Sequence, residues 1–238
     1  MTPSSSLYKN IERRSQMFNH VQHGIELEQL GCDTTPTGRF YFPPSGEKYP
    51  SVTTVLSVQD KSGLDAWKAR VGEEEAKRIS IQAANRGSDV HLIAENYLNN
   101  LPDYKKKCMP INLMTFNTLK PVIDERVNNI YFQEAPLYSH RIKTAGRVDL
   151  IAEFDGQLSI IDFKTSRKPK KAEWIEGYFM QESFYAAAFY ERTGLAIKQL
   201  VTLVMVDDDK PQVFIEQPMK WLPKFLELRN KYKSVHGI

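Results

Sequence analysis

Residues 146–165, GRVDLIAEFDGQLSIIDFKT, form the stretch that decides the fold. Two apolar runs flank Asp155-Gly156, and this dipeptide between such runs is a strong sequence signal for a two-residue β-hairpin turn. We therefore expect strands at about 146–154 and 158–164, joined by that turn.

The register of this hairpin brings charged residues together. It sets Asp149 directly opposite Asp162 and Arg147 opposite Lys164, and opposed residues project from the same face of a sheet. Alternation along the strand puts Lys164 on that face beside Asp162. Two facing carboxylates destabilise a sheet unless a positive charge lies between them. A divalent cation with oxygen ligands, Mg²⁺ or Mn²⁺, supplies that charge.

The remaining pattern predicts helices before the hairpin and a helix with further strands after it. This order is typical of a mixed α/β fold, with a central, mostly antiparallel sheet flanked by helices and an N-terminal helical elaboration. Residues 1–46 are expected to form an arm and a short hairpin, and 47–238 a domain whose helical region 63–130 roofs the site. The expected strands are 39–42, 131–140, 197–206 and 213–217; the expected helices are 64–71, 73–85, 88–98, 110–129, 177–192 and one from 218, with Arg86-Gly87 as a break and Gly194 as a C-terminal cap.

Composition excludes several classes of protein. The chain is 41% hydrophobic and 26% charged, as in ordinary soluble proteins, and its apolar runs are too short for a membrane span. Its 2 cysteines are too few for a four-cysteine metal site, and no Gly-rich phosphate loop is present. The net charge is only +3, but residues 164–171, KTSRKPKK, hold a basic block next to the carboxylates. That block favours contact with phosphates.

Four motifs in order resemble the RecB-like branch of the PD-(D/E)XK nuclease superfamily. An acid in Gly-Arg-Val-Asp149 precedes Asp162-Phe-Lys-Thr-Ser-x-Lys-Pro at the end of the next strand. Gln181-Glu-Ser-Phe-Tyr185 is similar to the branch's helical Gln-x-x-x-Tyr motif, and His91 lies in Arg-Gly-x-x-x-His-x-x-x-Glu95. The resemblance covers roughly residues 47–235, beginning at Lys-Tyr-Pro-Ser-Val-Thr. It extends to a group of genome-maintenance exonucleases with mitochondrial and phage-like members.

The resemblance implies a restriction-endonuclease-like core and a role for each motif residue. Lys164 acts in catalysis with Asp149 and Asp162, and the metal ligands are His91, Asp149, Asp162 and the Phe163 carbonyl. Glu95 and Glu134 are further candidates for the site. Ser51 and Thr53 supply hydroxyls that either bind phosphate or cap the next helix. The expected DNA contacts are Gln181, Tyr185, Arg147, Thr165, Ser51, Thr53, Lys68 and Arg86.

The expected function is that of a Mg²⁺- or Mn²⁺-dependent DNA exonuclease that prefers single-stranded ends. It would act in replication, repair or recombination, with DNA and proteins of those processes as partners and no membrane. Two alternatives stay open, a structure-specific endonuclease of the same fold and a non-catalytic nucleic-acid-binding protein. The lack of a long N-terminal extension favours a bacterial or phage-infected cytoplasm over mitochondria.

Overall fold

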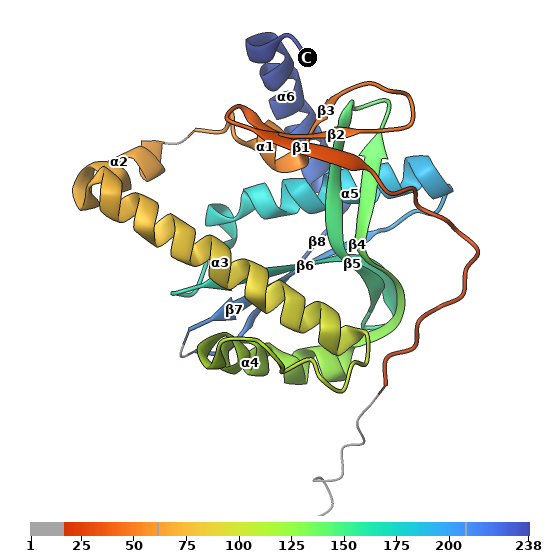
Figure 1. The fold of residues 1–238 in the computed structure, drawn as a ribbon. Coiled ribbons are helices and arrows are strands. Elements are labelled where there is room, and N and C mark those ends of the chain that lie inside the picture. The colour runs from red at the N-terminus through yellow and green to blue at the C-terminus, as the bar shows by residue number, and fades with distance from the viewer. Residues whose placement is uncertain (1–16, 61, 208) are drawn as a thin grey trace, which may run out of the picture.

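A five-stranded sheet forms the centre of the computed structural model, which describes residues 17–60, 62–207 and 209–238. Its strands, in spatial order, are β4 (Val127–Ser139), β5 (Thr144–Phe154), β6 (Gln157–Ser166), β7 (Gln199–Val206) and β8 (Gln212–Glu216). β6 and β7 are parallel, and the other neighbours are antiparallel. The predicted mixed α/β fold with a mostly antiparallel sheet is confirmed (Figure 1). The arm or weak helix expected at the N-terminus falls largely on residues 1–16, outside the described part.

The turn between β5 and β6 has the predicted geometry. Asp155 and Gly156 have φ angles of 52° and 76°, as a type I′ turn requires. Strand pairing from Phe154↔Gln157 to Leu150↔Ile161 follows the predicted register. The dipeptide therefore fixes which residues of the two strands face each other near the turn.

Helices cover both faces of the sheet (Figure 1). On one face lie α3 (Glu73–Leu98) and α4 (Pro110–Arg126), which pack against side chains such as Ile161 and Phe163. On the other face lie α1 (Val52–Leu56), α5 (Glu176–Thr193) and α6 (Pro218–His236), which pack against side chains such as Ile160. Adjacent residues of β6 thus belong to opposite cores, as the period of a strand requires.

The connection from β6 to β7 follows from their parallel arrangement, because parallel neighbours need a crossover. A short 3-10 helix, η1 (Ala172–Trp174), leads into α5, which returns the chain along the sheet. Gly194 ends α5 with a φ angle of 74°, the left-handed C-terminal cap that the sequence predicts. The crossover lays α5 over the end of β6.

Helix α3 is one continuous helix of 26 residues, so the predicted break at Arg86-Gly87 is wrong. A glycine inside a helix costs only about 1 kcal/mol relative to alanine. Side chains around it make tertiary contacts that outweigh this cost. Arg86 pairs with Asp207 at the end of β7, and Asp89 accepts a hydrogen bond of 2.6 Å from the Asn112 side chain on α4.

Two boundaries nearby also differ from the prediction. The helix expected to reach residue 129 ends at Arg126, because Val127 is buried and already pairs with Phe154 as the first residue of β4. The helix expected over 64–71 begins at Ser62 and forms α2 (Ser62–Val71). Tertiary pairing and packing, rather than local preference, set these ends.

A small second sheet packs beside the main one. It consists of β1 (Gly31–Thr35), β2 (Gly38–Phe42) and β3 (Tyr49–Pro50). Ser51 continues β3 into an isolated bridge with Ala145 of β5, and Tyr41 and Tyr49 are buried against Tyr138. The small sheet therefore joins residues on both sides of the boundary expected at 46. None of the helices in the described residues combines the length and apolarity needed to cross a membrane.

Candidate active site

The main sheet opens between β5 and β6 a short way beyond the hairpin turn. Backbone pairing between these strands stops at Leu150↔Ile161. From there β5 continues along β4 as far as Thr144, while β6 continues along β7 as far as Ser166. Because each strand follows a different neighbour, a gap opens between them at the acids that the sequence singles out.

The predicted pairing beyond this point is wrong. Asp149 is not paired with Asp162, nor Arg147 with Lys164, because the ladder between β5 and β6 has ended. Arg147 pairs with Pro136 of β4 instead. The charged side chains gather at a split in the sheet rather than on a continuous face.

Phe163 links the two sides of the split through its main chain. Its N–H donates to Asp149 Oδ2 at 2.9 Å, and its carbonyl oxygen lies 2.6 Å from His91 Nε2. Since a carbonyl oxygen can only accept, Nε2 carries a proton, and in the neutral ring Nδ1 is left with a lone pair. That nitrogen lies 3.4 Å from Asp149 Oδ2, so it faces the carboxylate side of the gap.

Glu134 stands opposite Asp149 on β4. The flanking pairs Gln133↔Leu150 and Ala135↔Val148 set this alignment, and Glu134 itself has a φ angle of 46°. Ligand atoms of His91, Glu134 and Asp149 all lie within 4.8 Å of one another. The alignment of β4 with β5 therefore completes a cluster of three side chains with metal-binding groups.

The electrostatics of this cluster fit a divalent cation. Burial, together with the negative charges of Asp149 and Glu95, raises the pKa of Glu134 to about 7. The cluster therefore holds more carboxylate charge than its own surroundings neutralise. Carboxylate oxygens with an imidazole nitrogen are ligands suited to Mn²⁺, and to Mg²⁺ through the oxygens.

Asp162 and Lys164 form an ion pair next to this cluster. The Asp162 carboxylate is 1% exposed and contacts the Lys164 ammonium, which is 19% exposed. Burial alone would lower the pKa of Lys164, but Asp162 and Asp149 outweigh burial and raise that pKa above its usual value. Lys164 is therefore a charged hydrogen-bond donor at neutral pH and not a base.

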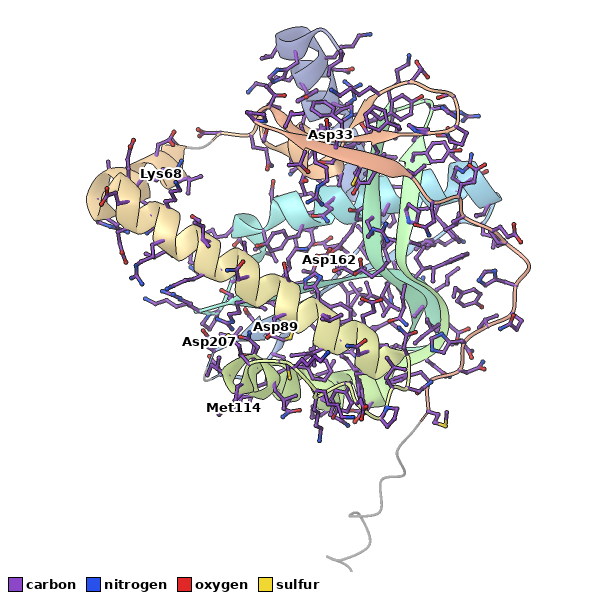
Figure 2. All side chains as sticks on the ribbon, in the orientation of Figure 1. Asp33, Lys68, Asp89, Met114, Asp162 and Asp207 are labelled. Carbon is purple, nitrogen blue, oxygen red and sulfur yellow. The ribbon has the colours of Figure 1, made fainter. Side chains whose placement is uncertain are left out.

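Helix α5 covers the ion pair from the other face of the sheet. Gln181 Nε2 lies 3.4 Å from Asp162 Oδ1 and 3.3 Å from the Tyr185 hydroxyl, as their spacing on one helix face allows. Figure 2 shows Asp162 between α3 and α5. The structure thus brings together the motif residues of β5, β6, α3 and α5.

Glu182 also belongs to this region, and sequence reasoning missed it. It is fully buried, and it accepts a hydrogen bond from Thr202, the register partner of Asp162 on β7. Burial raises the pKa of Glu182 well above its usual value, and Asp162 adds to this rise. A carboxylate between apolar residues of a buried helix was the available sequence signal.

A cavity of about 480 Å³ opens onto the His91, Glu134 and Asp149 cluster. Gly87, Ser88, Leu92 and Glu95 of α3 form one wall, so Glu95 lies beside the cluster as expected. Arg147 lines the cavity and binds the Glu134 carbonyl oxygen. Arg39 of β2 lines it too, although no sequence motif connects Arg39 to the site.

The residues expected to contact DNA differ in burial and in hydrogen-bond partners. Ser51 is buried and caps α1 by accepting from the Thr54 N–H at 3.0 Å, and the Thr53 hydroxyl lies 2.9 Å from Ser51 Oγ. Of the two roles predicted for these hydroxyls, Ser51 therefore has that of a helix cap, while the Thr53 hydroxyl contacts Ser51. Thr165 is half-buried on β6 beside Lys164.

Arg86 and Lys68, also expected to contact DNA, lie outside this cavity's lining as well. The Arg86 guanidinium is bound to Asp207 and lies 3.4 Å from Thr115 Oγ1. Lys68 is exposed on α2, away from Asp162 in Figure 2. Arg86 is thus part of the contact between α3 and the end of β7, while Lys68 belongs to an exposed surface.

Comparisons with known proteins agree with this geometry. The PD-(D/E)XK nuclease superfamily matches residues 113–228. The chain is 27% identical to human mitochondrial genome maintenance exonuclease 1 over 208 residues, and 26% identical to its Xenopus tropicalis counterpart over 129 residues. These alignments cover 78% and 51% of this chain, but only 59% and 37% of the two relatives' own lengths.

A third relative and a solved structure complete the comparison. The mouse mitochondrial genome maintenance exonuclease 1 is 24% identical over 136 residues, which are 54% of this chain and 40% of the mouse protein. A structure from Eubacterium rectale, described as a candidate exonuclease, covers 63% of this chain and 68% of its own at 15% identity. Its TM-score of 0.37 is too low to carry an argument.

These relatives correct the expected location. All three are mitochondrial proteins by name, so the expectation of a bacterial or phage-infected cytoplasm is wrong. The point at which the sequence begins carries no information about the compartment in which the protein works.

The family match and the candidate site fall on the same part of the chain. Residues 113–228 include Glu134, Asp149, the Asp162–Lys164 pair and Gln181, and α3 adds His91 from outside that range. Residues 113–228 therefore match the PD-(D/E)XK nuclease superfamily over the part of the chain that holds most of the candidate site.

Proposed function

We propose that this chain is a Mg²⁺- or Mn²⁺-dependent deoxyribonuclease that removes nucleotides from DNA ends, with a preference for single strands. The observation that carries the proposal is the meeting of two groups at Phe163. His91, Glu134 and Asp149 form a cluster that could hold a metal ion, and the half-buried Lys164 ammonium lies on the other side of the same main-chain segment.

Each group has a role in phosphodiester hydrolysis. His91, Glu134 and Asp149 would hold a divalent cation, which supplies Lewis-acid activation of the phosphate and of a water molecule. The ammonium of Lys164 would donate to a phosphate oxygen and offset the charge that develops there. Asp162 positions that ammonium, and the Gln181 amide holds Asp162 from α5.

The choice of exonuclease activity and of DNA as the substrate is supported by similarity to the relatives and by the charge near the site. The relatives' name contains the word exonuclease, and the basic block at 164–171 gives a DNA strand a favourable surface beside the site. A role in the replication, repair or recombination of DNA, with partners from those processes, belongs to the same proposal. Gln181, Arg147, Thr165 and Lys68 remain the proposed DNA contacts, whereas Tyr185 is only 2% exposed and packs in the core.

An end-labelled single-stranded oligonucleotide tests the activity. The wild-type protein should shorten it in the presence of Mg²⁺ or Mn²⁺ and not in EDTA, and should leave a closed single-stranded circle intact. Rapid cutting of the circle would instead support an endonuclease. No cutting under any metal condition, with DNA binding intact, would support a non-catalytic binding protein.

Two lysine variants test the mechanism. Lys164→Ala should lower the cleavage rate on the order of a hundredfold or more while DNA binding stays nearly unchanged. Lys198→Ala is the matched control, because Lys198 is exposed and precedes β7 at the hairpin end of the sheet. Near-wild-type cleavage by Lys164→Ala would refute the assigned role.

A further inference from the structure

Arg39 reaches the cavity of the candidate active site from a separate sheet. It belongs to β2, whereas the metal-binding cluster is built from α3, β4 and β5. Its side chain is exposed and lines the same cavity of about 480 Å³ as His91, Glu134 and Asp149. A positively charged residue therefore borders the space in which the proposed reaction takes place.

The backbone of Arg39 is fixed by three hydrogen bonds. Its N–H donates to Thr54 Oγ1 at 2.9 Å, and its carbonyl oxygen accepts from the Ser51 N–H at 2.8 Å and from Thr54 Oγ1 at 3.2 Å. Thr54 approaches so closely that a Cβ atom at Gly38 would lie 2.4 Å from it, and Gly38 has a φ angle of 137°. The Thr54 hydroxyl and the Ser51 N–H thus hold the backbone of Arg39 in place.

The sheet that carries Arg39 is itself anchored. Ser51 bridges to Ala145 of β5, the strand that bears Asp149, and the Tyr49 hydroxyl lies 2.8 Å from His140 Nδ1 in the turn after β4. Position 39 is therefore held relative to β5 by pairing within the small sheet and by the bridge from Ser51 to Ala145. Rigid elements of this kind place binding groups accurately.

The charges of the cavity leave Arg39 available for a ligand. Arg147, the other arginine of the lining, has its guanidinium on the Glu134 carbonyl oxygen. Within residues 17–60, 62–207 and 209–238, the hydrogen bond of the Arg39 side chain is a long one, 3.4 Å from Nε to Thr34 Oγ1. Its two terminal NH₂ groups have no hydrogen-bond partner among those residues, so both can donate to a ligand in the cavity that Arg39 lines.

We propose that Arg39 binds the non-bridging oxygens of a DNA phosphate next to the scissile one, and so holds the strand end against the metal-binding cluster. The inference rests on the proposed nuclease function and names a substrate-positioning residue for it. A guanidinium matches two phosphate oxygens at once, which a lysine in the same place cannot do.

The first experiment measures DNA binding by the full chain as a function of salt. A fluorescent single-stranded oligonucleotide is titrated in Ca²⁺, with wild type, Arg39→Ala, Arg39→Lys and Arg141→Ala, an exposed arginine in the turn after β4. Arg39→Ala should bind roughly tenfold to a hundredfold more weakly, the range for one charged hydrogen-bonded contact. Its slope of log K against log salt should fall by about 0.7, the value for one phosphate on a single strand.

The two other variants separate the effect of the positive charge from that of the guanidinium geometry and from a general loss of charge. Arg39→Lys should keep the salt slope of the wild type and recover only part of the affinity, because it restores the charge and not the fork. Arg141→Ala should match the wild type in both quantities. An Arg39→Ala protein with unchanged affinity and slope would overturn the proposal, as would an Arg141→Ala protein equally impaired.

A scan of neutral methylphosphonates along the oligonucleotide locates the contact. Wild-type binding should weaken most when one phosphate near the end is neutralised, and Arg39→Ala should be insensitive at that position alone. Equal sensitivity of both proteins at every position would refute the contact. Cleavage of the unmodified strand by the wild type tests the proposed function separately, so a failure of one is distinguishable from a failure of the other.

Discussion

Adding a methyl group at Gly146 is expected to destabilise the protein by overpacking. Gly146 lies three positions before Asp149 on β5, beneath the Tyr185 ring of α5. A Cβ atom there would lie 2.8 Å from Tyr185 Cε1, 2.9 Å from the Tyr185 hydroxyl oxygen and 3.2 Å from Val52 Cγ1. Contacts below 3.0 Å force a neighbour to move, and the ring is the neighbour in the way.

The size of the effect follows from the burial of that ring. Tyr185 is 2% exposed and packs against Phe184 in the core under α5, so it has little room to retreat. Extra atoms in a well-packed core cost about 1–3 kcal/mol. Gly146→Ala should therefore lower the free energy of unfolding by about 2 kcal/mol. Because Gln181 links Tyr185 to Asp162, the shift should also slow DNA cleavage.

Urea unfolding of a double-mutant set measures this. Gly146→Ala is made alone and together with Tyr185→Leu, which removes the atoms that the new methyl group would meet. The loss caused by Gly146→Ala should shrink by about 1 kcal/mol or more in the Tyr185→Leu background. Equal losses in both backgrounds, or no loss in the first, would show that the ring does not restrain position 146.

Gly87→Ala is the matched control. Gly87 lies inside α3, and a Cβ atom there would meet no heavy atom within 4 Å. The same substitution should raise the free energy of unfolding by about 0.5–1 kcal/mol, the usual gain when alanine replaces glycine inside a helix. The two glycines are thus expected to respond with opposite signs.

Two further predictions concern Glu134 and Arg86. The pKa of Glu134 is raised to about 7, so the folded, metal-free protein takes up a proton as the pH falls through 7, and the stability from this group is lost as the pH rises. Added Mn²⁺ should therefore raise the melting temperature of the wild type more at about pH 8 than at about pH 6. In Glu134→Gln the rise should depend less on pH. A pH-independent rise in the wild type would contradict metal binding by Glu134. Arg86→Ala should lower the free energy of unfolding by roughly 1.5–3 kcal/mol, measured in urea, since it breaks a half-buried ion pair with Asp207. Unchanged stability with weakened DNA binding would show instead that Arg86 contacts phosphate.

The sequence predicts the part of the site that depends on local structure. The Asp155-Gly156 turn fixes the register near the hairpin, and period-two alternation sets Lys164 beside Asp162. The same local rules place Gln181 and Tyr185 on one face of a helix. These relations need only the regular geometry of a strand or a helix.

The rest of the site depends on distant parts of the chain. The ladder between β5 and β6 ends at Leu150↔Ile161 because each strand has another partner, which the hairpin sequence does not reveal. Glu134 joins Asp149 through a register set after two irregularities in β4, and its own backbone is left-handed. Arg39 enters from a separate sheet, so no motif spacing could connect it to the cluster.

The main-chain bonds at Phe163 have a consequence for mutagenesis. Its N–H and carbonyl group hold Asp149 and His91, and the exchange of one side chain for another leaves both polar groups in the polypeptide. An alanine scan would therefore register position 163 as a packing residue alone. Replacing the amide at that position by an ester removes the N–H donor and leaves the ring in place. This backbone substitution can measure how far the Phe163 N–H itself holds Asp149 of β5 beside β6.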